Sequence, residues 1–418
     1  MSKERILSYI TTHYLESYDF NGIIVNQIPE YDIEELVELI KEDKIFILSE
    51  ADDINIFINR LNLYKSKEEQ IKVIKTDNEC IAYPTKEHLK TIKINETNPF
   101  TKMLAEGNEQ LKIVYFNVGV VELYANNPIY QIYDKGYGGT IFLTNEEEVE
   151  DTIHSEYIKN FGVAYPKNER PDADRAIGVF LRDLSNLNFE AQCKWRGFML
   201  PNQEDFLINK NFVQTLICGE WASGCWVFDA LLKEMEVIND MCDNMQIPHL
   251  FSVIYPQEVC QSLGYRIILV PSLKNYYEFI SSLEKIIVSN LNYKTFTTVS
   301  RGVCNIDRRR EDGILKGSIS MLEEWINKNY HSPDPRTAEY FKEDVINVLK
   351  DIREIRQIPA HEFYGNTHDK SLYCKQNELI NKAYRAIKII RLIFNRHPSN
   401  KNFNIPQELL DENKINTY

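Results

Sequence analysis

The sequence predicts an α+β protein with a mixed N-terminal α/β region, a mainly helical middle and a C-terminal helical bundle. Three observations carry this prediction. Short β-rich runs separated by turn residues fill residues 22–145, apolar residues recur every three or four positions over most of residues 150–300, and three amphipathic segments follow residue 314. A length of 418 residues also favours two or three domains over one.

The first expected domain, residues 1–148, combines short helices with strands. An amphipathic helix is predicted near the N-terminus, and a second helix begins where Asp32 and Glu35 stand in capping-box spacing. The predicted strands are "KIFILSE", "QIKVIK" and "ECIAY". Residues 112–146 are expected to form further strands, broken at the turn-like "ANNP" and "DKGYGG". The acidic run "NEEEVED" then marks a boundary and a helix start.

The second expected domain, residues 149–303, is mainly helical with a few strands. The predicted helices are "RAIGVFLRDL", "NFEAQCKWRGFML", residues 211–242 and "KNYYEFISSLEKIIVSNL", and the predicted strands are "YRIILV" and "HLFSVIY". Trp195, Trp221 and Trp226 fall in this part. Aromatic residues at helical spacing are more often core residues than a stacking platform for bases, so the core interpretation is preferred.

The third expected domain, residues 314–418, contains helices at about 314–330, 335–357 and 371–396. The chain carries 48 basic and 62 acidic residues, and its net charge of −14 argues against a general nucleic-acid binder. The acidity is uneven, however. From Ile314 onwards there are 16 Lys and Arg against 14 Asp and Glu, so only this C-terminal part has the slightly positive balance that contact with phosphates favours.

Targeting and cysteine signals indicate a cytoplasmic protein without a membrane segment. The longest apolar runs are too short to span a bilayer, and the N-terminus lacks an apolar signal region. The eight cysteines form no C-x-x-C pair, which is typical of free thiols in a reducing compartment. A metal knuckle at Cys218 and Cys225 is disfavoured, so no metal and no cofactor are expected.

One stretch suggests chemistry: "DIREIRQIPAHEFYGN", residues 351–366. Pro359 lacks a backbone donor and disfavours helical angles at the preceding residue, so the helix is expected to stop near Arg356–Gln357. On an unbroken helix, positions five apart are separated by about 140° around the axis. A break would instead let Arg356 and His361 face one cleft, with a turn following at Gly365.

An arginine and a histidine together suit RNA strand cleavage. The RNA 2′-hydroxyl attacks the adjacent phosphorus, so no activated water is required. A histidine moves the protons near neutral pH, and a guanidinium binds the phosphate oxygens as their charge grows. One histidine can hardly be base and acid at once, which favours a dimer with two sets of residues. The alternative is an ordinary helix end, in which Arg356 pairs with Glu354 or Glu362 and His361 caps the helix.

At these residues the chain resembles HEPN domains, the helical ribonuclease modules of toxin–antitoxin, abortive-infection and CRISPR-linked defence systems. "R-Q-I-P-A-H" is similar to their R-x4-6-H motif, and long helices lie on both sides of it. The resemblance covers roughly the last 100 residues. It implies a HEPN-like bundle, a homodimer with a composite active site, metal-independent RNA cleavage and a growth-arrest or anti-phage role. Arg356 and His361 are the implied catalytic pair.

The match departs from the family in two places. Gln357 follows the arginine where Asn, Asp or His is frequent. Phe363 stands where one toxin subfamily has a tyrosine that its antitoxin modifies, and Tyr364 follows it. Gln357, Tyr364 and Arg353 are therefore supporting candidates, with Arg353 also a weaker alternative to Arg356.

Two functions are expected to compete. The first is an endoribonuclease held in check by the N-terminal 300 residues, with RNA as substrate and an antitoxin or phage signal as further partner. Three basic side chains on the last long helix are candidates for contacts with the RNA backbone: Lys382, Arg385 and Lys388. The second is a non-catalytic HEPN-like dimerisation module attached to a domain that senses a ligand or partner.

Overall fold

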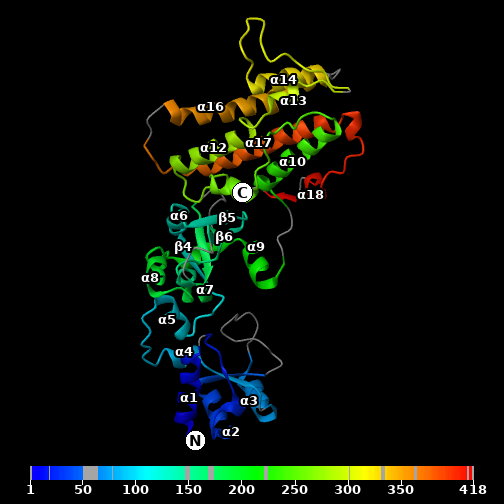
Figure 1. The fold of residues 1–418 in the computed structure, drawn as a ribbon. Helices are drawn as coiled ribbons and strands as arrows, with labels where there is room; N and C mark the ends of the chain where they lie inside the picture. The colour runs from blue at the N-terminus through cyan, green and yellow to red at the C-terminus, as the bar shows by residue number, and fades with distance from the viewer. Residues whose placement is uncertain are drawn as a thin grey trace. The chain divides into compact units, whose positions relative to one another are not determined.

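Helices and strands are mixed along the chain in the computed structural model, which confirms the α+β class (Figure 1). The structure describes residues 2–17, 19–49, 65–77, 79–145, 151–167, 174–220, 225–300, 302–330, 335–361, 365–411 and 414–416. The chain divides into two compact units. Unit 1 is Met1–Val120, Asn145–Phe161 and Ala176–Glu204, and unit 2 is Val121–Thr144, Gly162–Arg175 and Asp205–Tyr418.

Unit 1 begins with a three-stranded antiparallel sheet of order β1-β3-β2. Its strands are β1 (Ile23–Ile24), β2 (Ile45–Leu48) and β3 (Ile81–Pro84), and its helices are α1 (Lys3–Glu16), α2 (Ile33–Lys41) and α3 (Lys67–Thr76). Apolar residues from these helices and strands, among them Ile10, Leu36 and Ile47, form one buried core. The helix expected at Asp32 is confirmed, because the Asp32 carboxylate caps α2 by accepting the Glu34 N–H at 2.9 Å.

The strand expected at "QIKVIK" was wrong, because these residues lie within α3. A capping box starts this helix. The Ser66 hydroxyl accepts the Glu69 N–H at 3.2 Å, and the Glu69 carboxylate accepts the Ser66 N–H at 2.7 Å. Two satisfied donors at the helix start outweigh the modest β preference of the isoleucine and valine residues.

The remainder of unit 1 combines short helices with an antiparallel strand pair. The helices are α4 (Lys86–Leu89), α5 (Pro99–Ala105), α7 (Leu181–Ser185) and α8 (Phe189–Gly197), and the strands are β4 (Ile113–Asn117) and β8 (Ala176–Phe180). β4 and β8 pair from Ile113↔Phe180 to Asn117↔Ala176. The helix expected over "RAIGVFLRDL" was therefore wrong in its first half. Every residue of β8 is buried, and a short continuous apolar run has no period that separates a buried strand from a helix.

A further group of strands comprises the antiparallel pair of β5 with β6 and the antiparallel pairing of β9 with β7. The further strands are β5 (Tyr130–Asp134), β6 (Gly138–Leu143), β7 (Asn160–Pro166) and β9 (Phe206–Ile208). β5 and β6 form the hairpin predicted around "DKGYGG", and Gly136 has the positive φ of 77° that its turn requires. The pair β10 (Cys225–Trp226) and β11 (Ile415–Asn416) is parallel.

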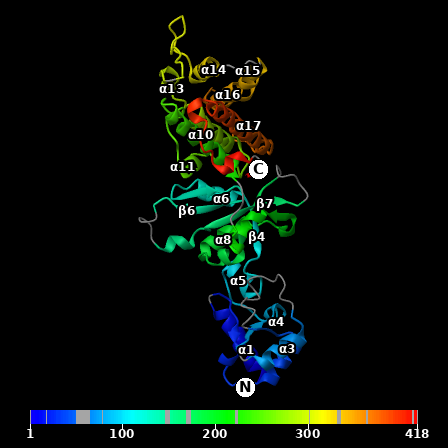
Figure 2. The ribbon, with the colours of Figure 1, turned by 90° about the vertical axis from the view of Figure 1, so that its right-hand side faces the viewer.

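Helices make up most of unit 2. Their bounds are α9 (Lys210–Val213), α10 (Val227–Asn244), α11 (Gln257–Ser262), α12 (Leu273–Ile287), α13 (Tyr293–Thr297), α14 (Ser318–Asn329), α15 (Pro335–Phe341), α16 (Val348–His361), α17 (Ser371–Phe394) and α18 (Gln407–Leu410). π-helical segments cover Gln214–Cys218 and Lys342–Asn347, and 3₁₀ segments cover Val25–Gln27, Asp151–Ser155, Gln203–Asp205 and Pro398–Asn400. α10 packs along α17 (Figures 1 and 2), and α12 packs against α16 (Figure 1).

Some expectations for unit 2 were confirmed and others were wrong. The C-terminal helices lie close to their predicted ranges, and Trp195, in unit 1, is a core residue with no exposed surface. The strands expected at "YRIILV" and "HLFSVIY" do not form, and Phe251 makes only an isolated bridge to Leu291. Residues 119–125 form α6 (Gly119–Ala125) instead of a strand. Trp221 and most of the acidic run at 145–151 lie outside the described residues.

The expected division into 1–148, 149–303 and 314–418 differs from the two compact units. Helices from both sides of residue 303 belong to unit 2 and pack against one another, as α10 does with α17. The C-terminal helices therefore share a core with helices of the middle segment. Among the described helices, none is both long and apolar enough to cross a membrane.

Candidate functional site at the end of helix α16

The Arg–His motif occupies the last turns of α16. Apolar residues at three- and four-residue spacing make this segment helical. Val348, Leu349 and Ile352 are buried, whereas Asp351 and Glu354 are exposed. The buried face packs α16 against α12 and α17. This packing fixes the direction of the helix that carries the motif.

The expected helix stop at Arg356–Gln357 was wrong, because α16 continues through Pro359 to His361. Pro359 lies in the final turn, where its missing N–H removes a single helical hydrogen bond, the one to the carbonyl of residue 355, and the helix runs only two residues further. On this continuous helix, positions 356 and 361 are separated by about 140° around the axis. The break that was expected to bring Arg356 and His361 into one cleft within a chain is absent.

Arg356 itself is exposed, and so is Gln357 beside it. Within the described part of the chain, the Arg356 guanidinium makes no hydrogen bond and no ion pair. In particular, the alternative pairing with Glu354 is not formed. The side chain of His361, together with Glu362, Phe363 and Tyr364, lies outside the described residues, so the predicted catalytic pair stays a prediction.

Arg353 is used differently. Its Nε lies 3.8 Å from Oε1 of Glu284 on α12, and its Nη2 lies 3.4 Å from the Ser318 hydroxyl. Glu284 is buried, and the Ser289 hydroxyl donates to the same carboxylate at 2.9 Å. Arg353 therefore joins α16 to α12 and α14, which is a structural role that the sequence spacing did not reveal.

A groove of about 340 Å³ runs beside the motif. Residues from α12, α16 and α17 line it: Tyr276, Val348, Asp351, Glu354, Ile355, Lys375, Glu378, Leu379 and Lys382. Its α16 wall carries the carboxylates of Asp351 and Glu354, and its α17 wall carries Lys375, Glu378 and Lys382. The groove therefore offers both signs of charge next to the exposed end of α16.

The basic residues expected to contact RNA lie on α17 with different exposures. Lys382 and Arg385 are exposed, and Lys382 pairs with Glu378 at 2.6 Å. Lys388 is half-buried, and Arg391, three residues further, is buried. A row spaced by three drifts about 60° around the helix at each step, which explains why its last members turn into the protein.

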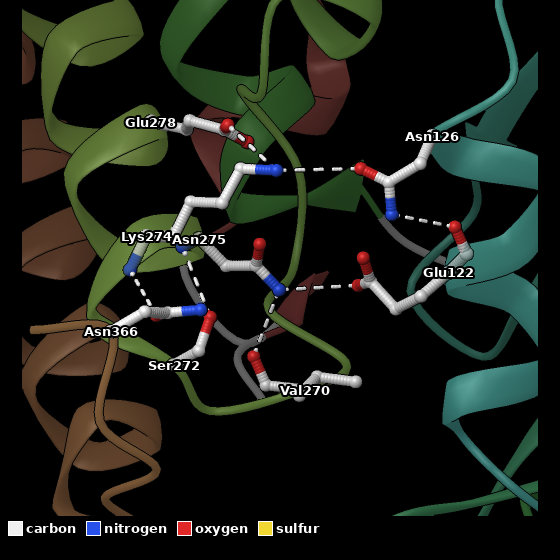
Figure 3. A network of polar contacts seen from close by, with 8 residues as sticks. All are labelled: Glu122, Asn126, Val270, Ser272, Lys274, Asn275, Glu278 and Asn366. Atoms are coloured by element: carbon white, nitrogen blue, oxygen red, sulfur yellow. Dashed lines mark hydrogen bonds and ion pairs between the residues drawn. The ribbon is translucent and has the colours of Figure 1, made fainter.

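Residues 366–369 form hydrogen bonds with the start of α12 and the residues just before it, and Figure 3 shows the one made by Asn366. The Asn366 side chain accepts the Lys274 N–H at 3.0 Å, and the Thr367 carbonyl accepts the Leu273 N–H at 3.1 Å. The Asp369 N–H donates to the Pro271 carbonyl at 2.8 Å. Residues 365–370, which we call the cap loop, thus supply partners for N–H groups that a helix start leaves unsatisfied.

The start of α12 is bound in turn to α6 and the residue after it, as Figure 3 shows. The Asn275 amide donates to the Glu122 carboxylate at 3.1 Å, and the Lys274 ammonium lies 3.4 Å from the Asn126 side-chain oxygen. The Asn126 amide donates to the Glu122 carbonyl at 2.7 Å. Burial raises the pKa of Glu122, and the charge of Arg266 opposes this effect.

A second group of titratable residues lies between β5, α10 and α11. The Asp229 carboxylate accepts a hydrogen bond from Gln257, whose side-chain oxygen accepts one from Tyr133 at 2.8 Å. Burial, followed by the nearby charge of Asp134, raises the pKa of Asp229 to about 7. Burial also raises the pKa of Asp134, which accepts the N–H groups of Gly136 and Ile267.

The raised pKa values of Asp229 and Asp134 predict that the free energy of unfolding falls as the pH rises. A folded-state pKa of about 7 for Asp229, against an ordinary 3.8, means that the folded chain keeps a proton that the unfolded chain has released. Stability is therefore fully present below about pH 4 for this group and is lost as the pH passes 7. Asp229→Asn should remove on the order of 2–3 kcal/mol of the loss between pH 5 and pH 8, because the folded pKa lies about two units above pH 5 and each unit corresponds to about 1.4 kcal/mol.

Urea unfolding at the two pH values measures this effect. Asp240→Asn, an exposed carboxylate on the same helix, is the matched control and should unfold like the wild type. An Asp229→Asn variant that loses as much stability as the wild type over this interval would contradict the assignment.

Comparisons of the chain with protein-family models, curated proteins and solved structures give no significant match. The function is therefore argued from the site.

Proposed function

We propose that the chain is a HEPN-type endoribonuclease that acts as an anti-phage defence or toxin effector. This proposal rests on the different environments of two neighbouring arginines, Arg353 and Arg356. Arg353 is held by Glu284 and Ser318, whereas Arg356, one helical turn later, is exposed and makes no polar contact with the described residues. Arg356 precedes His361 by five positions, in the R-x4-H spacing.

The reaction assigns one role to each residue type. A histidine takes the proton of the RNA 2′-hydroxyl, whose oxygen forms a bond to the adjacent phosphorus. The bond from phosphorus to the 5′-oxygen breaks, a second histidine gives that oxygen a proton, and a 2′,3′-cyclic phosphate and a 5′-hydroxyl result. Arg356 binds the non-bridging oxygens, on which negative charge grows in the transition state.

Two chains are needed for this arrangement. Each chain offers one motif histidine, and the continuous α16 separates positions 356 and 361 by about 140° around its axis. A site composed of the motifs of two chains supplies two histidines and two arginines. The proposed active form is therefore a homodimer with a shared site, and its attack by the 2′-hydroxyl uses no metal-bound water.

The test is RNA integrity and growth in cells that express wild type or His361→Ala, with and without phage infection. Wild type should fragment RNA and arrest growth, and His361→Ala should lose at least about 100-fold of the cleavage rate, within the range for an acid–base residue. Cleavage by purified wild type should continue in EDTA. His249→Ala, an exposed histidine paired with Asp243, is the control and should cleave normally.

The competing function is a dimerisation module without catalysis. It predicts a wild type that dimerises but cleaves no RNA under any of these conditions, and this result would refute the nuclease. Cleavage by His361→Ala at the wild-type rate would instead refute the site while leaving an activity to explain.

A further inference from the structure

The cap loop, which follows the motif along the chain, is held to the rest of unit 2 by hydrogen bonds. The first N–H groups of α12 have no partner within the helix. Those of Leu273 and Lys274 are satisfied by Thr367 and Asn366, and that of Asn275 by the Ser272 hydroxyl at 3.3 Å. Two of the three partners thus come from a segment about ninety residues further along the chain rather than from the residue before the helix.

The position of the loop restricts the motif. Asn366 follows His361 by five residues, and five residues span at most about 18 Å. The other end of the loop is also held, because the Lys370 ammonium lies 2.5 Å from the Asp174 carboxylate. Fixing both ends of the loop limits where the end of α16 can lie.

Lys274 and Asn275 of α12 connect the cap loop to α6 and the residue after it (Figure 3). Lys274 gives its backbone N–H to Asn366 and directs its ammonium to Asn126. Asn275 completes the first turn of α12 and gives its side-chain amide to Glu122. A displacement of α6 therefore acts on the residues that hold the loop.

Resting on the proposed function, we propose that Asn366 is a positioning residue for the Arg356–His361 site and that Glu122 is the far end of the same tether. The tether gives the enzyme a point of control. Glu122 lies directly after Val121, where the chain begins unit 2. An event that moves α6 would change the geometry of the motif without contact with the RNA.

The kinetic test uses purified full-length protein and a fluorogenic single-stranded RNA. Asn366→Ala should lower kcat at least about tenfold and change KM less than about threefold, because a displacement of about 1 Å in a site costs more in rate than in binding. Asn366→Asp should restore kcat, since its carboxylate accepts the Lys274 N–H and is favoured at a helix start. Asn244→Ala, an exposed asparagine at the end of α10, is the control.

A second measurement does not depend on activity. Amide hydrogen exchange in peptides covering residues 271–276 and 366–372 should rise in Asn366→Ala and in Glu122→Ala and stay unchanged in Asn244→Ala. Wild-type kcat in Asn366→Ala would refute the positioning role, and unchanged exchange in Glu122→Ala would refute the link to α6. A wild type without ribonuclease activity would refute the proposed function, and the exchange data would still decide on the tether.

Discussion

Replacing Glu234 by alanine is expected to lower the free energy of unfolding by about 3–5 kcal/mol, the largest effect on stability that we predict. Glu234 on α10 and Arg391 on α17 form a buried ion pair, with 0% and 2% of their side chains exposed. The Arg391 Nε and Nη2 both donate to the carboxylate, the latter at 3.2 Å. Removing the carboxylate leaves a guanidinium without a partner in the core.

Urea unfolding of the purified protein measures this loss. Glu236→Ala, an exposed carboxylate on the same helix, is the matched control and should change stability by no more than about 0.5 kcal/mol. The double variant Glu234→Met/Arg391→Met should recover most of the loss, because apolar residues of similar size need no partner. Equal unfolding of Glu234→Ala and Glu236→Ala would contradict the buried pair.

The second large effect is on catalysis: Arg356→Ala is expected to lower kcat by about 10²–10³, the range for removal of one group that stabilises transition-state charge. Its unfolding should match that of the wild type, because the side chain is exposed and makes no hydrogen bond or ion pair with the described residues. Arg356→Lys should recover only part of the rate, since an ammonium cannot bind two phosphate oxygens as a planar guanidinium does.

Arg353→Ala should give the opposite result. It removes the positively charged partner of the buried Glu284 carboxylate and leaves the Ser289 hydroxyl, so stability should fall by on the order of 1–2 kcal/mol while the rate per folded molecule is kept. Paired assays of cleavage and urea unfolding separate the two arginines. Loss of cleavage without loss of stability in Arg353→Ala would show that the motif uses Arg353 instead.

The sequence was sufficient to predict those elements whose structure is set by residues close together in the chain. The helix beginning at Asp32, the hairpin around Gly136 and the range of α17 were all predicted from caps, turns and spacing. Predictions failed where short apolar runs are ambiguous. The run at 176–180 is a strand buried along its whole length, and the run in α3 is helical because a capping box precedes it.

The candidate site was predictable only in part, for a related reason. The R-x4-H spacing and the flanking helices can be read along one segment. The role of Arg353, the burial of Arg391 and the binding of Asn366 to Lys274 depend on residues far away in the sequence, separated by 157 positions for Arg391 and Glu234 and by 92 for Asn366 and Lys274. Contacts between residues this far apart leave no periodic pattern in the sequence. Many other residues of the same type could equally well have been the partner.

The residues that complete the hydrogen bonding of α12 are synthesised after the helix itself, and this order has a consequence during translation. When α10 and α12 leave the ribosome, Glu234 has no counter-ion and the first turn of α12 has only its local Ser272 cap, since Arg391, Asn366 and Thr367 come from beyond residue 365. Contacts between such distant segments form slowly. A nascent or truncated chain that stops before Asn366 therefore cannot complete the bundle that carries the motif. If the chain is the ribonuclease that we propose, we expect this order of assembly to leave unfinished chains inactive on the ribosome that makes them.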